Sequence, residues 1–179
     1  MLTLIGIVVV VFLIMTYNKL VSLKNIVKEA WSGIDVQLSY RHNLIPNLCN
    51  TVKGYATHEK DIFENIAKFR SQCISATDVK DKSITENALS SSLKTLFAVA
   101  ENYPELKANE NFLDLQRQLA NTEDNIQKAR RYYNGTARDF NTIISQFPSN
   151  IVAVLTGFNQ VDFFELEVQS ERELPEVKF

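Results

Sequence analysis

Apolar side chains form one unbroken run at the beginning of the chain. Residues 1–15 contain a single polar residue, Thr3, and no charged residue appears before Lys19. With the next two residues the run reaches about 16 to 18 residues, close to the shortest helix that spans a bilayer. Tyr17 and Lys19 suit the headgroup region, which favours aromatic rings and long cationic side chains. The pattern predicts a transmembrane anchor over residues 1–17.

Two other interpretations of this run stay open at this point, a cleaved signal peptide and a buried core helix. A signal peptide carries positive charge before the apolar run and a small-residue cleavage site after it. A buried core helix normally keeps a polar face. No Lys or Arg precedes the run, no small-residue cleavage site follows it, and the run itself has no polar face.

The charges that flank the anchor indicate its orientation. No Lys or Arg precedes the run, whereas Lys19, Lys24 and Lys28 follow it. The positive-inside rule therefore places the bulk of the chain in the cytoplasm and the N-terminus outside. Cys49 and Cys73 would then be free thiols in a reducing compartment.

Beyond the anchor, apolar residues recur every three or four positions, which is the spacing of an amphipathic helix. The first stripe consists of Leu20, Leu23, Val27, Trp31, Ile34, Leu38, Ile45, Leu48 and Val52. Few helix breakers interrupt this stretch, so we expect the anchor to continue into the first soluble helix. Pro46 is expected to kink or restart that helix, because proline lacks an amide hydrogen and clashes with the preceding turn.

Further apolar stripes predict three more helices. Pro104 closes the second of these and Pro148 stops the last, which Gly135 should weaken locally. The stripes cover about residues 55–73, 83–101 and 108–146, with a polar loop near residues 75–83. Four amphipathic helices with short links predict an all-α fold, in which an antiparallel four-helix bundle over residues 18–148 follows the transmembrane helix.

The C-terminal tail, residues 149–179, differs from the bundle. Ser149 is expected to cap a short helix over residues 151–155. In one interpretation the apolar tail folds back over one end of the bundle. In the other it forms an oligomer contact or rests on the membrane. The residues assigned to this contact are Ile151, Val152, Val154, Leu155, Phe158, Phe163 and Phe164.

Composition narrows the function classes. The 179 residues are 45% hydrophobic and carry a net charge of −2, with two Cys and two His. A general nucleic-acid binder needs a basic excess, and a disordered chain needs low hydrophobicity. Two Cys and two His also argue against a disulfide scaffold or a Cys/His zinc domain. We expect one domain with a short appendage and no nucleic-acid partner.

The sequence shows no motif that names a reaction. His58 and Glu59 begin like a helical zinc-protease motif, but Ile62 stands where the second His is required. The Glu-x-x-His pairs of a di-iron bundle are missing as well. No phosphate-binding glycine loop or nucleophile elbow occurs, and both Cys are interpreted as small core residues. We therefore assign no catalytic, cofactor-binding or metal-binding residue and expect no enzyme.

Three charged residues fall on the apolar stripes. Arg41 lies between Leu38 and Ile45, while Glu123 and Arg130 interrupt the stripe of the last helix. Buried charges are costly unless they are paired. We predict a structural polar layer in which Glu123 pairs with Arg41 or Arg130 and fixes the register of the helices. The alternative is that the periodicity slips by one residue and all three face water.

Blocks of residues along nine tenths of the chain resemble the LemA family of bacterial membrane-anchored proteins. They are Tyr17-Asn18, Ala30-Trp31-Ser32, Leu44-Ile45-Pro46-Asn47-Leu48, Thr51-Val52-Lys53-Gly54-Tyr55-Ala56, Tyr103-Pro104, Thr122-Glu123, Tyr133-Asn134, Phe147-Pro148-Ser149-Asn150 and Phe163-Phe164-Glu165. The resemblance implies a bacterial inner-membrane protein with one N-terminal helix and a cytoplasmic four-helix bundle of bromodomain-like, up-and-down handedness. It provides no catalytic residue to carry over.

Anchor, bundle and missing catalytic motif together favour a membrane-anchored scaffold or adaptor. Such a protein acts through self-assembly as a homo-oligomer or through a protein partner at the cytoplasmic face. One alternative is a lipid- or peptide-binding module that uses the tail or the basic face of the last helix. Another is an enzyme with a polar site around Arg41, Glu123 and Arg130. The physiological process, the partner and the number of subunits are left open by the sequence.

Overall fold

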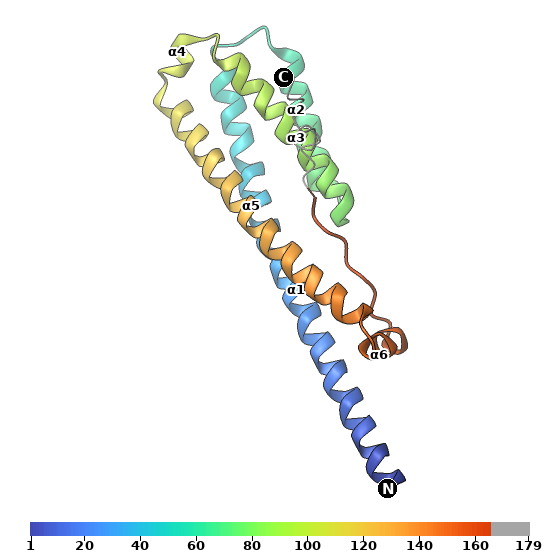
Figure 1. The fold of residues 1–179 in the computed structure, drawn as a ribbon. Helices are drawn as coiled ribbons and strands as arrows, with labels where there is room; N and C mark the ends of the chain where they lie inside the picture. The colour runs from blue at the N-terminus through green and yellow to red at the C-terminus, as the bar shows by residue number, and fades with distance from the viewer. Residues whose placement is uncertain (166–179) are drawn as a thin grey trace, which may run out of the picture. The chain divides into compact units, whose positions relative to one another are not determined.

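The computed structural model describes residues 1–165, and within them every regular element is a helix (Figure 1). The predicted all-α class is therefore confirmed, while residues 166–179 of the predicted tail lie outside the described residues. The helices are α1 (Leu2–Lys53), α2 (Lys60–Ser75), α3 (Val79–Ala100), α4 (Pro104–Lys107), α5 (Glu110–Ser145) and α6 (Ser149–Thr156).

Helix α1 contains both the apolar run and the first amphipathic stripe in 52 continuous residues, as predicted. Among the described residues it is the one helix long and apolar enough to cross a membrane. Only 6% of its apolar window is buried, so this run is not the core helix of a soluble domain. The prediction of a single N-terminal membrane helix is supported in this form.

Pro46 does not restart the helix, so this part of the prediction is wrong. Helix α1 continues through Pro46 to Lys53. Because proline has no amide hydrogen, the carbonyl of His42, four residues earlier, receives no hydrogen bond from position 46. The Nε of Arg70 on α2 donates to that carbonyl oxygen at 2.8 Å instead. A side chain from a second helix thus satisfies the carbonyl that the proline leaves open.

The described chain forms two compact units. Among the described residues, unit 1 comprises Met1–Ser39 and Glu123–Phe163, and unit 2 comprises Tyr40–Thr122 with Phe164 and Glu165. Helices α1 and α5 each contribute residues to both units.

In unit 1 the apolar stripes of α1 and α5 supply most of the core, and the buried face of α6 completes it. The buried residues are Leu20, Val27, Ala30, Ile34 and Leu38 from α1, Ile126, Tyr133, Ala137, Phe140 and Ile144 from α5, and Val152 and Ala153 from α6. The rings of Trp31 and Tyr133 pack with centroids 5.2 Å apart. Leu20, Val27, Ile34 and Leu38 belong to the first stripe predicted from periodicity.

The segment that follows α6 is tied to α5. Gly157 ends α6 in the left-handed conformation, with φ of 75°. Asn141 forms two hydrogen bonds of 2.9 Å with the backbone of Val161, one as donor and one as acceptor. The hydroxyl of Tyr133 donates to the carbonyl of Asp162 at 2.8 Å. The backbone up to Asp162 therefore packs within its own chain.

Unit 2 has a core to which α1, α2, α3, α4 and α5 all contribute. Its members are Leu44, Ile45, Leu48, Val52, Ala56, Phe63, Ile66, Cys73, Leu89, Leu93, Leu96, Ala100, Leu106, Phe112 and Leu119. Helix α4 was not predicted, and its four residues place Leu106 in this core. Phe164 is also fully buried, and the Ser83 hydroxyl donates to the carbonyl of Glu165. This part of the tail packs on unit 2 of the same chain.

Two predicted details of the connections are wrong. The polar loop near residues 75–83 is much shorter, because α3 already begins at Val79 after an N-cap by Asp78, whose side chain accepts from the Asp81 amide at 2.7 Å. Ser149 does not cap α6 but is its first residue. Its hydroxyl donates to carbonyls near the end of α5 instead. In both cases a local side-chain hydrogen bond sets where the helix begins, against what the composition of the segment suggested.

The bond between Arg70 and the His42 carbonyl can be tested by a double-mutant cycle with Pro46. Arg70→Met should lower the free energy of unfolding by about 1–3 kcal/mol, because it removes the donor from a backbone acceptor inside the protein. In a Pro46→Ala background the loss should be smaller, since the alanine amide can donate to the same carbonyl. Urea unfolding of the detergent-solubilised protein measures both. Lys68→Met, an exposed change on the same helix, is the control, and an equal loss from Arg70→Met in both backgrounds would contradict this account.

Candidate functional site

Unit 2 buries a group of polar and ionisable side chains between three helices. Arg41 and His42 come from α1, Cys73 from α2, and Glu86 and Ser90 from α3. We call these five residues the polar cluster. The side chains of Arg41 and Glu86 are 2% and 0% exposed. Ions removed from water to this degree need partners, so their contacts decide what the cluster can do.

Glu86 is the centre of the polar cluster. One carboxylate oxygen accepts from the Arg41 guanidinium, and the other lies 2.8 Å from Nε2 of His42. A second guanidinium nitrogen of Arg41 donates to the Ser90 hydroxyl at 2.9 Å. Both oxygens of the buried carboxylate are therefore occupied, and α1 is linked to α3 by charge-assisted hydrogen bonds.

The protonation states follow from these contacts. Burial by itself would raise the pKa of Glu86, but the hydrogen bond with His42 and the charge of Arg41 outweigh it and hold that pKa below its ordinary value. Glu86 is thus a carboxylate at neutral pH. Burial, with the negative charge of Glu86 as a smaller cause, raises the pKa of the Cys73 thiol to about 12. Cys73 is therefore a protonated thiol and not an activated nucleophile.

Three members of the polar cluster are residue types that bind metals. Donor atoms of His42, Cys73 and Glu86 all lie within 4.8 Å of one another. A metal such as Zn²⁺ would need the Cys73 thiolate and at least one oxygen of Glu86. Both oxygens of Glu86 are occupied, and the Arg41 guanidinium would remain beside the added dication. The geometry favours a neutralised ion pair over a metal centre.

The three residues of the predicted polar layer differ in burial and do not all belong to the same unit. Arg41 is buried, so the alternative in which all three charges face water is wrong for Arg41. Glu123 and Arg130 lie in unit 1 and are half-buried. Each also bonds to Gln127: a Glu123 oxygen accepts from its amide at 3.4 Å, and Arg130 donates to its carbonyl at 2.5 Å. The pairing of Glu123 with Arg41 or Arg130 stays a prediction.

Glu86, the partner of Arg41, was missed by sequence reasoning. It lies three residues before Leu89, so the apolar stripe of α3 extended back by one turn reaches it. The stretch before it was interpreted as a loop because it is polar. In the structure that stretch forms the first turns of α3, and Ser83 and Glu86 are buried there. The signal was the helical spacing of these two polar residues with Leu89.

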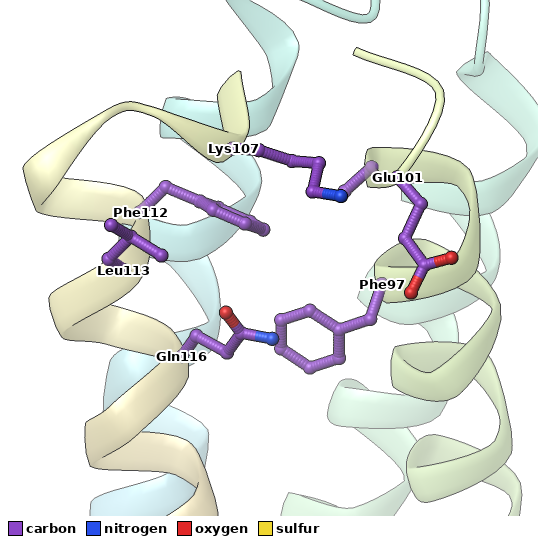
Figure 2. A pocket seen from close by; sticks show the side chains of 7 residues that line it. Phe97, Glu101, Lys107, Phe112, Leu113 and Gln116 are labelled. Carbon is purple, nitrogen blue, oxygen red and sulfur yellow. The ribbon is translucent and has the colours of Figure 1, made fainter. Parts of the chain in front are cut away.

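Unit 2 also has a small open pocket where α3, α4 and α5 meet (Figure 2). Its volume is about 120 Å³, well below the several hundred Å³ of ordinary ligand sites. Phe97 and Phe112 line it with ring centroids 6.2 Å apart, and Glu101 and Lys107 add charge. It contains no residue of the polar layer or the polar cluster, so it gives no support to the alternative of an enzyme site.

The predicted tail contacts divide into exposed and buried residues. The prediction of an oligomer or membrane contact is wrong for Val152 and Phe164, because both are buried against their own chain. Phe158 is half-buried. The exposed ones are Ile151, Val154, Leu155 and Phe163. Three of these, Ile151, Val154 and Leu155, share one face of α6 at helical spacing.

Fold and site together define an all-helical, membrane-associated protein with one apolar helix of membrane-spanning length and a sealed polar cluster. The sequence model of the LemA family matches residues 30–179. The chain therefore belongs to the LemA family, as its resemblance indicated.

Relatives among characterised proteins agree with this assignment. Magnetosome protein MamQ of Magnetospirillum gryphiswaldense is 24% identical, over 85% of this chain. Magnetosome protein MamQ 2 of Paramagnetospirillum magneticum is 25% identical, over 86%. Protein LemA of Metamycoplasma hominis is 29% identical, over 83% of this chain and 68% of its own length. The chain spans 65% and 66% of the two MamQ proteins, respectively.

Glu86→Gln should lower the free energy of unfolding at neutral pH by about 3–5 kcal/mol, because it leaves the buried Arg41 charge without its counter-ion. Replacing both partners, Arg41→Met with Glu86→Leu, should restore most of the loss. Glu64→Gln, whose side chain is 64% exposed, should change it by less than about 1 kcal/mol. Urea unfolding in mild detergent gives all three values. If Glu86→Gln left the free energy of unfolding unchanged, the buried pair would contribute nothing to stability.

The loss caused by Glu86→Gln should depend on pH in a defined direction. The pKa of Glu86 is lower in the folded protein, so its ionised form stabilises the fold. That contribution is fully present above the unfolded carboxyl pKa of about 4.3 and disappears as pH falls through the lower folded pKa. The difference in unfolding free energy between wild type and variant should therefore be constant from neutral pH to about pH 5 and then shrink. A difference that grows on acidification would contradict the assignment.

Proposed function

We propose that this protein is a membrane-anchored scaffold or adaptor without catalytic activity, which acts through self-assembly or through protein partners. The observation that carries the proposal is the contrast between its interior and its surface. The ionisable groups of the polar cluster are sealed and neutralise one another, whereas apolar side chains along residues 3–15 and on α6 are exposed. Such a chain has exposed apolar surfaces through which it can associate with lipid or protein, and its polar cluster offers no accessible reactive group.

The fold proposed for this role is an antiparallel four-helix bundle over residues 18–148 with up-and-down, bromodomain-like handedness. Its support is the core of unit 2, which collects apolar stripes from the four long helices. The ion pair between Arg41 and Glu86 has a structural role in this proposal: it fixes the register of α1 against α3.

We further propose that the protein lies in the bacterial inner membrane with the bundle in the cytoplasm. The three lysines that follow the apolar run support this orientation. The MamQ relatives are named for a structure, the magnetosome, and not for a reaction, which supports a structural role here.

The second candidate function is a lipid- or peptide-binding module that uses the tail. One observation favours it: Ile151, Val154 and Leu155 form an exposed apolar face on α6. A module of this kind would bind its ligand without assembling, so the oligomeric state separates it from a self-assembling scaffold.

Self-assembly predicts a defined oligomer in mild detergent. The mass of the full chain, measured by light scattering with the detergent contribution subtracted, should be a multiple of 20.4 kDa. A chain that begins at Lys19 should lose at least part of this assembly, because subunits confined to one membrane meet at a higher effective concentration. Monomers in both cases would contradict self-assembly. A control with Thr3→Val keeps the apolar run and should assemble like the wild type.

A further inference from the structure

An exposed apolar surface lies next to the end of the membrane-spanning run in unit 1. It consists of Ile151, Val154 and Leu155 on α6 and of Phe147, which precedes α6, and we call it the α6 surface. Val154 and Leu155 are 79% and 76% exposed, and Phe147 is 81% exposed. Val152 and Ala153, on the opposite side of the helix, are buried. Helix α6 thus has one apolar face in the core and a second apolar face directed away from it.

Contacts within unit 1 place this surface beside the end of the apolar run of α1. The last turn of α6 is joined to Phe158, whose amide donates to the carbonyl of Ala153 at 3.0 Å. The Phe158 ring packs on Tyr17 with centroids 6.1 Å apart, and Nζ of Lys24 lies 5.3 Å from its centre. Figure 1 shows α6 beside α1 at the end of α5. Tyr17 closes the apolar run, and Lys19 is the first charge after it.

Charge distribution identifies the occupant of this surface. No charged residue occurs in the sequence between Asp139 and Asp162, the stretch that contains the α6 surface. Cations are present instead on the adjoining part of α1, at Lys19, Lys24 and Lys28. An uncharged apolar face beside lysines at the end of a membrane span matches a lipid interface, in which apolar side chains enter the acyl boundary and lysines contact anionic headgroups.

We propose that the α6 surface inserts into the headgroup–acyl boundary of the bilayer that α1 spans, and so forms a second membrane contact. The proposal rests on the membrane span in the proposed function and adds a peripheral contact to it. Helix α6 packs on α5 in the core of unit 1. The bilayer would then contact unit 1 at two places, the apolar run of α1 and the α6 surface. Rotation of unit 1 about the axis of α1 is thereby restricted.

The test uses a single tryptophan as a depth probe in the full chain. Trp31, the one native tryptophan, is replaced by Phe, and the probe is introduced by Val154→Trp or, in a second protein, by Leu155→Trp. The matched control is Tyr132→Trp, also an exposed position of unit 1. Its neighbour Tyr133 packs on Trp31, which lies about 21 Å beyond Tyr17 along α1. The proteins are reconstituted in vesicles of phosphatidylcholine and phosphatidylglycerol.

Two quenchers report where each probe lies. A nitroxide on the lipid acyl chain near the headgroup should quench the emission at positions 154 and 155 and leave position 132 unaffected. Iodide on both sides of the membrane should quench positions 154 and 155 about threefold less than position 132, as expected for side chains buried in the boundary. Iodide quenching equal to that at position 132 would overturn the proposal.

The remaining outcomes are also decisive. Probes shielded from iodide but untouched by the lipid nitroxide would show that a second copy or another protein covers the α6 surface, which overturns the lipid contact. Flotation of the vesicles distinguishes failure of the membrane span from failure of the α6 contact. If the chain does not float with the vesicles, the membrane span fails and the inference fails with it. If it floats and the probes face water, the inference fails while the proposed anchor stands.

Discussion

Helix α1 must satisfy different environments in one uninterrupted series of backbone hydrogen bonds. Its first turns expose apolar side chains on all sides, as a lipid-facing helix does, and its later turns bury a single stripe in the cores of both units. Inserting or deleting one residue in this helix would rotate all side chains after that point relative to those before it, because side-chain directions repeat every 3.6 residues. The continuity of α1 is therefore the constraint on which the other contacts depend.

Two polar contacts in unit 2 are consequences of this continuity. Pro46 removes one amide donor from the middle of α1, and Arg70 supplies the missing donor from α2. One turn earlier, Arg41 points into the core on the same stripe as Leu38 and Ile45, and Glu86 on α3 neutralises it. In each contact a side chain from a neighbouring helix supplies what α1 lacks locally, a donor in one case and a counter-ion in the other. The helices are thereby held at specific positions along one another, which apolar packing alone specifies less strictly.

The polar cluster combines residue types that serve as metal ligands or nucleophiles in other proteins, but here they are buried and bonded to one another. A His, a Cys and a Glu within 4.8 Å would suggest a metal or a nucleophile in an open cleft. Here burial keeps the thiol protonated, and Arg41 with His42 occupies the carboxylate. The same residue types therefore stabilise the interior, and the proposed function lies in the exposed apolar surfaces of the chain.

The sequence by itself determined the elements that depend on local pattern. The apolar run, the stripe from Leu20 to Val52 and the helical character of the chain follow from spacing, which each helix carries independently of the others. The burial of Arg41 could be predicted for the same reason. Its position on a stripe of apolar residues requires no knowledge of a partner.

Tertiary structure alone decided which side chains meet. Glu86 is 45 residues from Arg41, and Arg70 is 28 residues from His42, so their pairing depends on the register between helices. The split of the tail into buried Phe164 and exposed Leu155 depends likewise on where the chain folds back. Periodicity tells which face of a helix is apolar. It does not tell what lies opposite, because that is set by packing between segments far apart in the chain.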